Sequence, residues 1–173
     1  APLLPIVVVP ARMASTRVPG KPLADIDGKP MIVQLLDRAR EADIGPVIVA
    51  CGEEEIADAV RAAGGEAVLT RADHPSGSDR VFEAVEKFDP AGKYNAIVNL
   101  QGDLPALDPA AVAASLQALE ANDADIATLV VEMTDNLELE VENTGKAVGS
   151  LGEGARMGRA SSLTRVLSPA GEW

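Results

Sequence analysis

The chain has 173 residues, of which 47% are hydrophobic and 2% aromatic, and its formal net charge is -12. This length suits one domain, and the hydrophobic content excludes a disordered chain. The acidic balance excludes a general nucleic-acid binder, because a phosphate backbone requires clustered Lys and Arg. The single cysteine, Cys51, excludes an intrachain disulfide and a Cys-based zinc site.

The sequence contains no run of about 18 apolar residues, so we expect no membrane insertion. No basic stretch precedes an apolar segment at the N-terminus, so no signal peptide is predicted. The simplest expectation is a cytoplasmic protein, and a lone cysteine fits a reducing compartment.

Short apolar runs alternate with amphipathic segments along the first 131 residues. This alternation predicts an α/β fold with a mainly parallel sheet and helices on both faces. In chain order, the predicted elements are a strand over Leu3–Val9 ended by Pro10, a helix over Met31–Ala42, a strand over Pro46–Ala50, a helix over Glu53–Ala63, a strand over Ala67–Thr70, a helix over Val81–Phe88, a strand over Asn95–Leu100, a helix from Pro109 to Ala121 with Asp108 as its N-cap, and a strand over Ile126–Val131.

The last 40 residues differ from the rest. Thr134–Trp173 holds several glycines and little periodicity, so no element is predicted there. We therefore expect one domain over residues 1–133, followed by a tail or by part of a second lobe over residues 134–173.

The loop after the first strand, PARMASTRVPGKPL, is basic and contains small residues. In open α/β sheets, ligands bind outside the carboxyl ends of the strands, where this loop begins. Arg12 and Lys21 could hold phosphate oxygens, Arg as a planar fork and Lys as a point charge. The GxxxxGK[ST] pattern of a Walker A loop is absent. The alternative interpretation is a solvated basic loop.

A second candidate loop, LQGDLP, follows the fourth predicted strand. Asp103 could bind Mg²⁺, which typically takes one or two carboxylates together with substrate phosphates. Gln101 could exchange hydrogen bonds with a polyhydroxy ligand. The alternatives are a turn aspartate beside glycine and plain solvation of Gln101.

The third loop, TRADHPSGSDR, contains the only histidine, His74. No serine or cysteine nucleophile with an orienting acid accompanies it, so we interpret His74 as a polar loop residue or a ligand contact. Asp79 and Arg80 could cap and open the following helix, and Cys51 is expected to be a small apolar residue. The residues alone indicate a nucleotide and Mg²⁺ site that works by positioning and charge neutralisation.

These three loops and DGKPMI (Asp27–Ile32) resemble, in order and spacing, the motifs of the 3-deoxy-manno-octulosonate (Kdo) cytidylyltransferases, or CMP-Kdo synthetases. The resemblance covers most of the first 133 residues. It implies a Rossmann-like three-layer sandwich of the nucleotide-diphospho-sugar transferase type. It also implies transfer of CMP from CTP to Kdo, with release of pyrophosphate, for lipopolysaccharide biosynthesis.

The resemblance assigns roles to residues at matching positions. Arg12, Lys21 and Asp103 would be the catalytic residues, and Asp103 would bind Mg²⁺. The nucleotide would be bound by Ala11, Arg12, Ser15, Lys21, Arg71 and Ser76, and the sugar by Gln101 and Arg165.

The sequence departs from the family pattern after residue 133. Ser162 and Leu163 stand where aromatic residues are usual, and no residue supplies the second magnesium ligand of the family. Residues 134–173 would then be the start of an incomplete lobe for sugar binding and dimerisation, and full-length members would be homodimers. The alternatives are a cytidylyltransferase for another sugar acid and a CTP-binding module without turnover.

Overall fold

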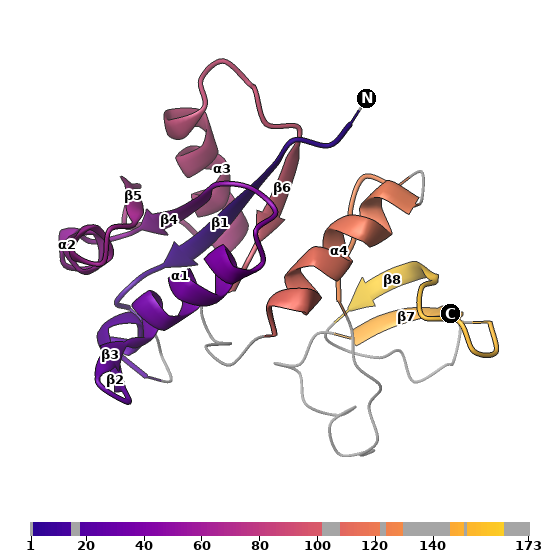
Figure 1. Ribbon diagram of the computed structural model, residues 1–173, viewed down its shortest axis with the longest axis horizontal. Helices are drawn as coiled ribbons and strands as arrows, with labels where there is room; N and C mark the ends of the chain where they lie inside the picture. The colour runs from indigo at the N-terminus through magenta and orange to yellow at the C-terminus, as the bar shows by residue number, and fades with distance from the viewer. Residues whose placement is uncertain are drawn as a thin grey trace. The chain divides into compact units, whose positions relative to one another are not determined.

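The computed structural model describes residues 2–14, 18–101, 108–121, 124–129, 146–150 and 152–164. The chain divides into two compact units, Ala1–Asp125 and Ile126–Trp173. Figure 1 shows the first unit as a sheet with helices and the second as a strand pair. The boundary predicted between residues 133 and 134 lies outside the described residues and stays a prediction.

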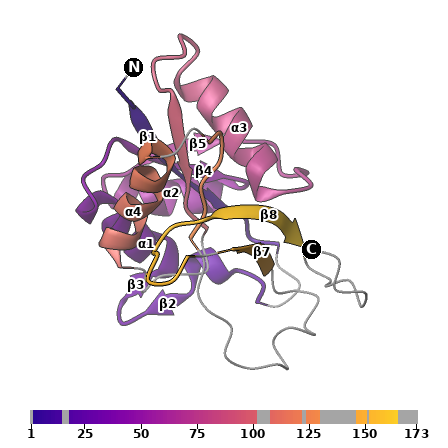
Figure 2. The same ribbon diagram turned by 90° about the vertical axis from the view of Figure 1, so that its right-hand side faces the viewer.

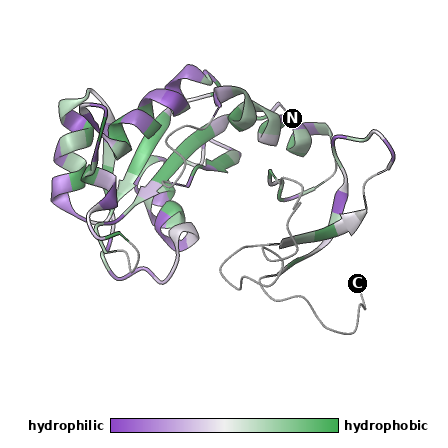
Figure 3. Ribbon diagram, turned by 90° about the horizontal axis from the view of Figure 1, so that it is seen from below, coloured by the Kyte–Doolittle hydropathy of each residue, from purple (hydrophilic) through white to green (hydrophobic). Residues whose placement is uncertain are grey.

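The centre of the first unit is a four-stranded parallel sheet with the strand order β5-β4-β1-β6. Its two central strands, β4 and β1, are buried almost throughout, as the continuous apolar runs predicted, and Figure 3 shows the middle of this sheet as largely hydrophobic. This arrangement confirms the predicted α/β class. The strands are β1 (Pro5–Ala11), β4 (Val47–Cys51), β5 (Glu66–Leu69) and β6 (Ala96–Asn99).

Helices cover both faces of this sheet. They are α1 (Met31–Glu41), α2 (Glu54–Ala62), α3 (Gly77–Phe88) and α4 (Pro109–Ala121). One core cluster joins α1, α2 and Val112 of α4 to the sheet, and a second joins α3 to the opposite face. Figure 2 shows α1 and α3 on opposite sides of the strands. The predicted N-cap of α4 is present, since the Asp108 carboxylate accepts a hydrogen bond from the Ala110 amide at 2.9 Å.

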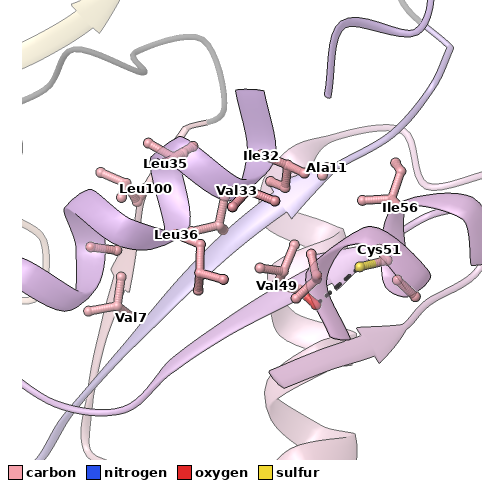
Figure 4. Packing of buried hydrophobic residues seen from close by; sticks show 14 of the residues in the cluster. Val7, Ala11, Ile32, Val33, Leu35, Leu36, Val49, Cys51, Ile56 and Leu100 are labelled. Carbon is pink, nitrogen blue, oxygen red and sulfur yellow. Dashed lines mark hydrogen bonds between the residues drawn. The ribbon is translucent and has the colours of Figure 1, made fainter. Parts of the chain in front are cut away.

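Cys51 belongs to the larger core cluster, as expected of a small apolar side chain. Its thiol is fully buried and lies 3.5 Å from the Val49 carbonyl oxygen, the contact dashed in Figure 4. Figure 4 also shows Val33 and Leu36 of α1, which belong to the same core cluster as Val49 and Cys51 of β4. Burial raises the pKa of the Cys51 thiol to about 12, so the thiol is held in its unreactive form.

The first strand does not end at Pro10, as predicted, but continues to Ala11. Pairing with β6 stops at Val8–Asn99, whereas pairing with β4 continues through Ala11–Cys51. The Val8 carbonyl accepts from Leu100, so the even positions of β1 face β6. The nitrogen of Pro10 therefore points to the β6 side of β1, where strand pairing has ended at Val8. The N–H group that proline lacks would have had no strand partner there.

One other predicted boundary and part of one predicted strand were wrong. The helix expected from Val81 begins one turn earlier, at Gly77. Residues 126–129 form no strand, and residues 130 and 131 of that predicted strand lie outside the described part of the chain.

Several short elements were not predicted. They are the 3-10 helix η1 (Lys21–Leu23), the hairpin of β2 (Asp25–Ile26) and β3 (Lys29–Pro30), and the antiparallel pair of β7 (Lys146–Ser150) and β8 (Arg159–Thr164). The first hairpin turns at Asp27 and Gly28, whose φ angles are 52° and 86°. An Asp-Gly pair favours such a turn because both positions need positive φ.

Candidate functional site

A pocket lies at the carboxyl ends of β1 and β6, where the strand order reverses. The chain runs from β1 outward to β4 and β5 and then returns to place β6 on the other side of β1. Open α/β sheets bind ligands at such a switch point. The pocket has a volume of about 160 Å³, and its lining residues are Pro10, Ala11, Arg12, His74, Ser76, Gly77, Arg80 and Gln101.

The basic loop begins at this pocket and is tied at both ends. The Gly20 amide donates to the Met13 carbonyl at 2.9 Å, and the Met13 amide donates to the Glu53 carboxylate at 2.9 Å. Gly20 has φ 72°, a conformation that favours glycine. The loop therefore leaves the sheet with exposed Arg12 and returns into η1 with half-buried Lys21.

The loop after β5 is held against α3. Ser76 is the N-cap of α3, and its hydroxyl accepts from the Asp79 amide at 3.1 Å. One turn along the helix, the Glu83 carboxylate accepts from the Arg71 amide at 3.3 Å and also bonds the imidazole of His74. Lys87 lies 2.6 Å from the same carboxylate.

These contacts lower the pKa of the Glu83 carboxyl to about 2. The largest cause is the hydrogen bond from Lys87, and the bonds from His74 and the Arg71 amide act in the same direction. Glu83 therefore stays ionised near neutral pH and joins the loop to the helix through charge-assisted hydrogen bonds.

Arg80 lies at the floor of the pocket and is 2% exposed. Its Nη1 donates to the Thr70 hydroxyl at 2.6 Å and to the Arg71 carbonyl at 2.9 Å, and its Nη2 donates to the Ala72 carbonyl at 3.3 Å. Burial lowers the pKa of this guanidinium, nearby Glu53 raises it, and the positive charge of Arg12 lowers it. The pocket thus contains two neighbouring cations.

The predicted site residues divide into three groups. Ala11, Arg12, Ser76 and Gln101 line the one pocket, where the Gln101 amide donates to the Asn99 side chain at 2.9 Å. Arg71 instead lines a neighbouring pocket of about 350 Å³, together with His74, and Lys21 lines neither. The remaining predicted residues, Ser15, Asp103 and Arg165, lie outside the described residues.

Arg80 was not predicted as a site residue. It was expected to open a helix, whereas its side chain is buried one turn inside α3. The available signal was helical spacing, because Arg80 is four residues before buried Ala84 and shares its face. Gly77, also in the pocket lining, was equally missed.

Among the residues that the structure describes, no three or more His, Cys, Asp or Glu side chains gather into a group able to hold a metal ion. In the same part of the chain, no helix combines the length and apolar character needed to cross a membrane.

The chain is similar over nearly its whole length to known cytidylyltransferases. The family model described as "Cytidylyltransferase" matches residues 6–157. The 3-deoxy-manno-octulosonate cytidylyltransferase of Rhodospirillum centenum is 58% identical over 172 residues, which are 99% of this chain and 67% of that protein. The chain belongs to the 3-deoxy-manno-octulosonate cytidylyltransferase family. The enzyme of the same name from Paramagnetospirillum magneticum is 55% identical, with coverage of 98% and 69%.

A solved structure of this family has the same fold. It is a CMP:2-keto-3-deoxy-manno-octonic acid synthetase complexed with CTP, 33% identical, with a TM-score of 0.77 and coverage of 98% of this chain and 67% of that one. The predicted family and the predicted nucleotidyltransferase fold are therefore both confirmed. The chain spans about two thirds of the length of these cytidylyltransferases.

Proposed function

We propose that this protein transfers CMP from CTP to Kdo and releases pyrophosphate. The observation that carries the proposal is its 58% identity, over 99% of its length, to a protein named for this reaction. The pocket supports it independently, because Arg12 and Arg80 supply positive charge where the sheet favours nucleotide binding. In the reaction, the anomeric hydroxyl of the sugar gives up its proton as its oxygen bonds to the α-phosphorus of CTP, and the bond between the α-phosphorus and the oxygen that bridges it to the β-phosphorus breaks, so that pyrophosphate leaves.

The residues of this chain serve binding and orientation in the proposed reaction. Arg12 and Lys21 hold triphosphate oxygens from the two ends of one loop. Such pre-positioning is the main source of catalysis in phosphoryl transfer. The cytidine is bound by Ala11, Ser15, Arg71 and Ser76, and the sugar by Gln101 and Arg165.

We further propose that Mg²⁺ assists the reaction. The support is the sequence position of Asp103, four residues after the last residue of β6. Asp103 is outside the described residues, and the described residues offer no alternative cluster of ligands. When bound, Mg²⁺ supplies neutralisation of phosphate charge.

The cellular setting follows from the proposed substrates. Kdo is a sugar acid of bacterial lipopolysaccharide, so the product serves lipopolysaccharide biosynthesis. CTP is a cytoplasmic nucleotide, so the proposed location is the cytoplasm. The family resemblance adds a homodimer as the proposed assembly of the full-length enzyme.

The decisive experiment is pyrophosphate release by the 173-residue chain with CTP and Mg²⁺, in the presence and absence of Kdo. Kdo-dependent release is expected, and a sialic acid in place of Kdo should give much less. Pyrophosphate release with sialic acid but not with Kdo would show that the substrate is another sugar acid. CTP binding without release would leave this chain as a nucleotide-binding module, and absence of both would overturn the proposal.

A further inference from the structure

The guanidinium of Arg80 is joined to three consecutive residues of the loop after β5. Its bonds go to the Thr70 hydroxyl and to the carbonyls of Arg71 and Ala72, at 2.6, 2.9 and 3.3 Å. The planar fork of arginine is suited to such a set, because its N–H groups point in fixed directions. A lysine at this position would keep the charge but could not reproduce the geometry.

All three acceptors are neutral, so this way of holding the loop carries the free-energy cost of burying a charge. Among the described residues, no carboxylate lies within ion-pair distance of Arg80, although the side chain is 2% exposed. A buried charge without a counterion is destabilising, and apolar residues often replace buried ionic groups without loss of stability. Departures of this kind from good packing concentrate at functional sites.

The backbone of a neighbouring loop is shaped around the same guanidinium. A Cβ atom on Gly52 would lie 2.8 Å from Nη1 and 3.2 Å from Cζ of Arg80, too close for either to stay in place. The Gly52 amide also donates to the Ala11 carbonyl at 2.9 Å. Arg80 is therefore packed between the loop that follows β4 and the loop that follows β5, in the lining of the pocket.

We propose that Arg80 is a positioning residue for recognition of the cytidine base, because it fixes the main chain of Thr70–Ala72, from which the Arg71 side chain extends. The inference rests on the proposed function, in which Arg71 belongs to the cytidine site. Glu83 holds the amide side of Arg71 and Arg80 holds its carbonyl side. The peptide groups on both sides of Arg71 are thus fixed by α3.

The test compares Arg80→Lys with Arg40→Lys, both retaining charge. Arg40 donates to the Gly64 carbonyl at 2.7 Å on an exposed surface, so it is a matched arginine–carbonyl contact away from the pocket. Binding of CTP and of inorganic tripolyphosphate would be measured by calorimetry at a temperature where every variant is folded. Arg80→Lys should weaken CTP binding about tenfold and tripolyphosphate binding less than about twofold. Arg40→Lys should change neither affinity.

Amide hydrogen exchange of the free protein gives a second readout. The Thr70 amide donates to the Cys51 carbonyl and the Arg71 amide to Glu83, so both report the order of this loop. Exchange at both should be faster in Arg80→Lys and in Gly52→Ala, which displaces the same guanidinium without changing Arg80. Gly52→Ala should also reproduce the selective loss of CTP affinity.

Each outcome bears on one of the two proposals. Equal losses for CTP and tripolyphosphate would show that Arg80 contributes to phosphate binding rather than to recognition of the base, which would overturn the positioning role. Unchanged affinity and unchanged exchange in both variants would overturn it as well. If the unmodified chain bound no CTP, the proposed function would fail, and hydrogen exchange would still decide whether Arg80 orders the loop.

Discussion

Replacing Glu83 by glutamine should lower the free energy of unfolding near neutral pH. The same replacement should lower it much less in acid. The folded protein holds the pKa of Glu83 at about 2, against an ordinary value of 4.5. A lowered pKa contributes stability that is present above the ordinary value and is lost as the pH falls from 4.5 towards 2. The difference corresponds to at most about 3 kcal/mol. Because the Glu83 side chain is 17% exposed and Lys87 is 52% exposed, solvent screening should reduce this to about 1–2 kcal/mol.

The assay is urea unfolding followed by circular dichroism at about pH 6.5 and about pH 3. Glu83→Gln should lose about 1–2 kcal/mol of unfolding free energy at the higher pH and less than about half of that at the lower. Glu86→Gln is the control, because Glu86 is an exposed glutamate of the same helix. An equal loss at both pH values would refute the electrostatic reasoning and assign the effect to hydrogen-bond geometry alone.

Three further predictions concern the site and the core. Lys21→Ala should weaken CTP binding about tenfold or more in calorimetry. The control Lys29→Ala, which removes an exposed lysine paired with Asp37, should leave CTP binding unchanged. Equal effects of the two substitutions would exclude Lys21 from the triphosphate site. Asp103→Asn should abolish Kdo-dependent pyrophosphate release without changing the unfolding midpoint, and persistent release would exclude Asp103 from the mechanism. The Cys51 thiol should resist a thiol reagent in the native protein and react once in urea, since it is fully buried; rapid native labelling would contradict the buried position.

The sheet was predictable because its strands are nearly pure apolar runs. Val7 and Val49, for example, are fully buried, and only a strand covered on both faces explains β-branched residues in such succession. The helix after β5 was harder to place, because its first turn reads Gly-Ser-Asp-Arg and lacks the apolar spacing that begins at Val81. Its actual start is marked by the N-cap Ser76, three residues before Asp79, a pattern that polar loops share.

The candidate site was predictable in residue type and only partly in geometry. Parallel strands bring their carboxyl ends to one edge, so Arg12 and Gln101 were expected together and do line one pocket. The separation of Arg71 from them could not be foreseen, because its side chain turns outward to Asp73, 3.1 Å away. The burial of Arg80 depends on carbonyls that only the folded loop directs inward.

The sign of charge at the pocket is opposite to that of the protein. The chain has 27 acidic and 15 basic residues, yet within the described part of the chain no carboxylate lines the pocket that contains Arg12 and Arg80. The neighbouring pocket, by contrast, includes Asp79, Glu83 and Glu86 among its lining residues. Because charges act over about a Debye length, near 10 Å in ordinary salt, a ligand in the first pocket responds to the local cations more than to the distant acids. A net charge of -12 therefore argues against binding to an extended polyanion but is compatible with a compact anion such as a nucleoside triphosphate.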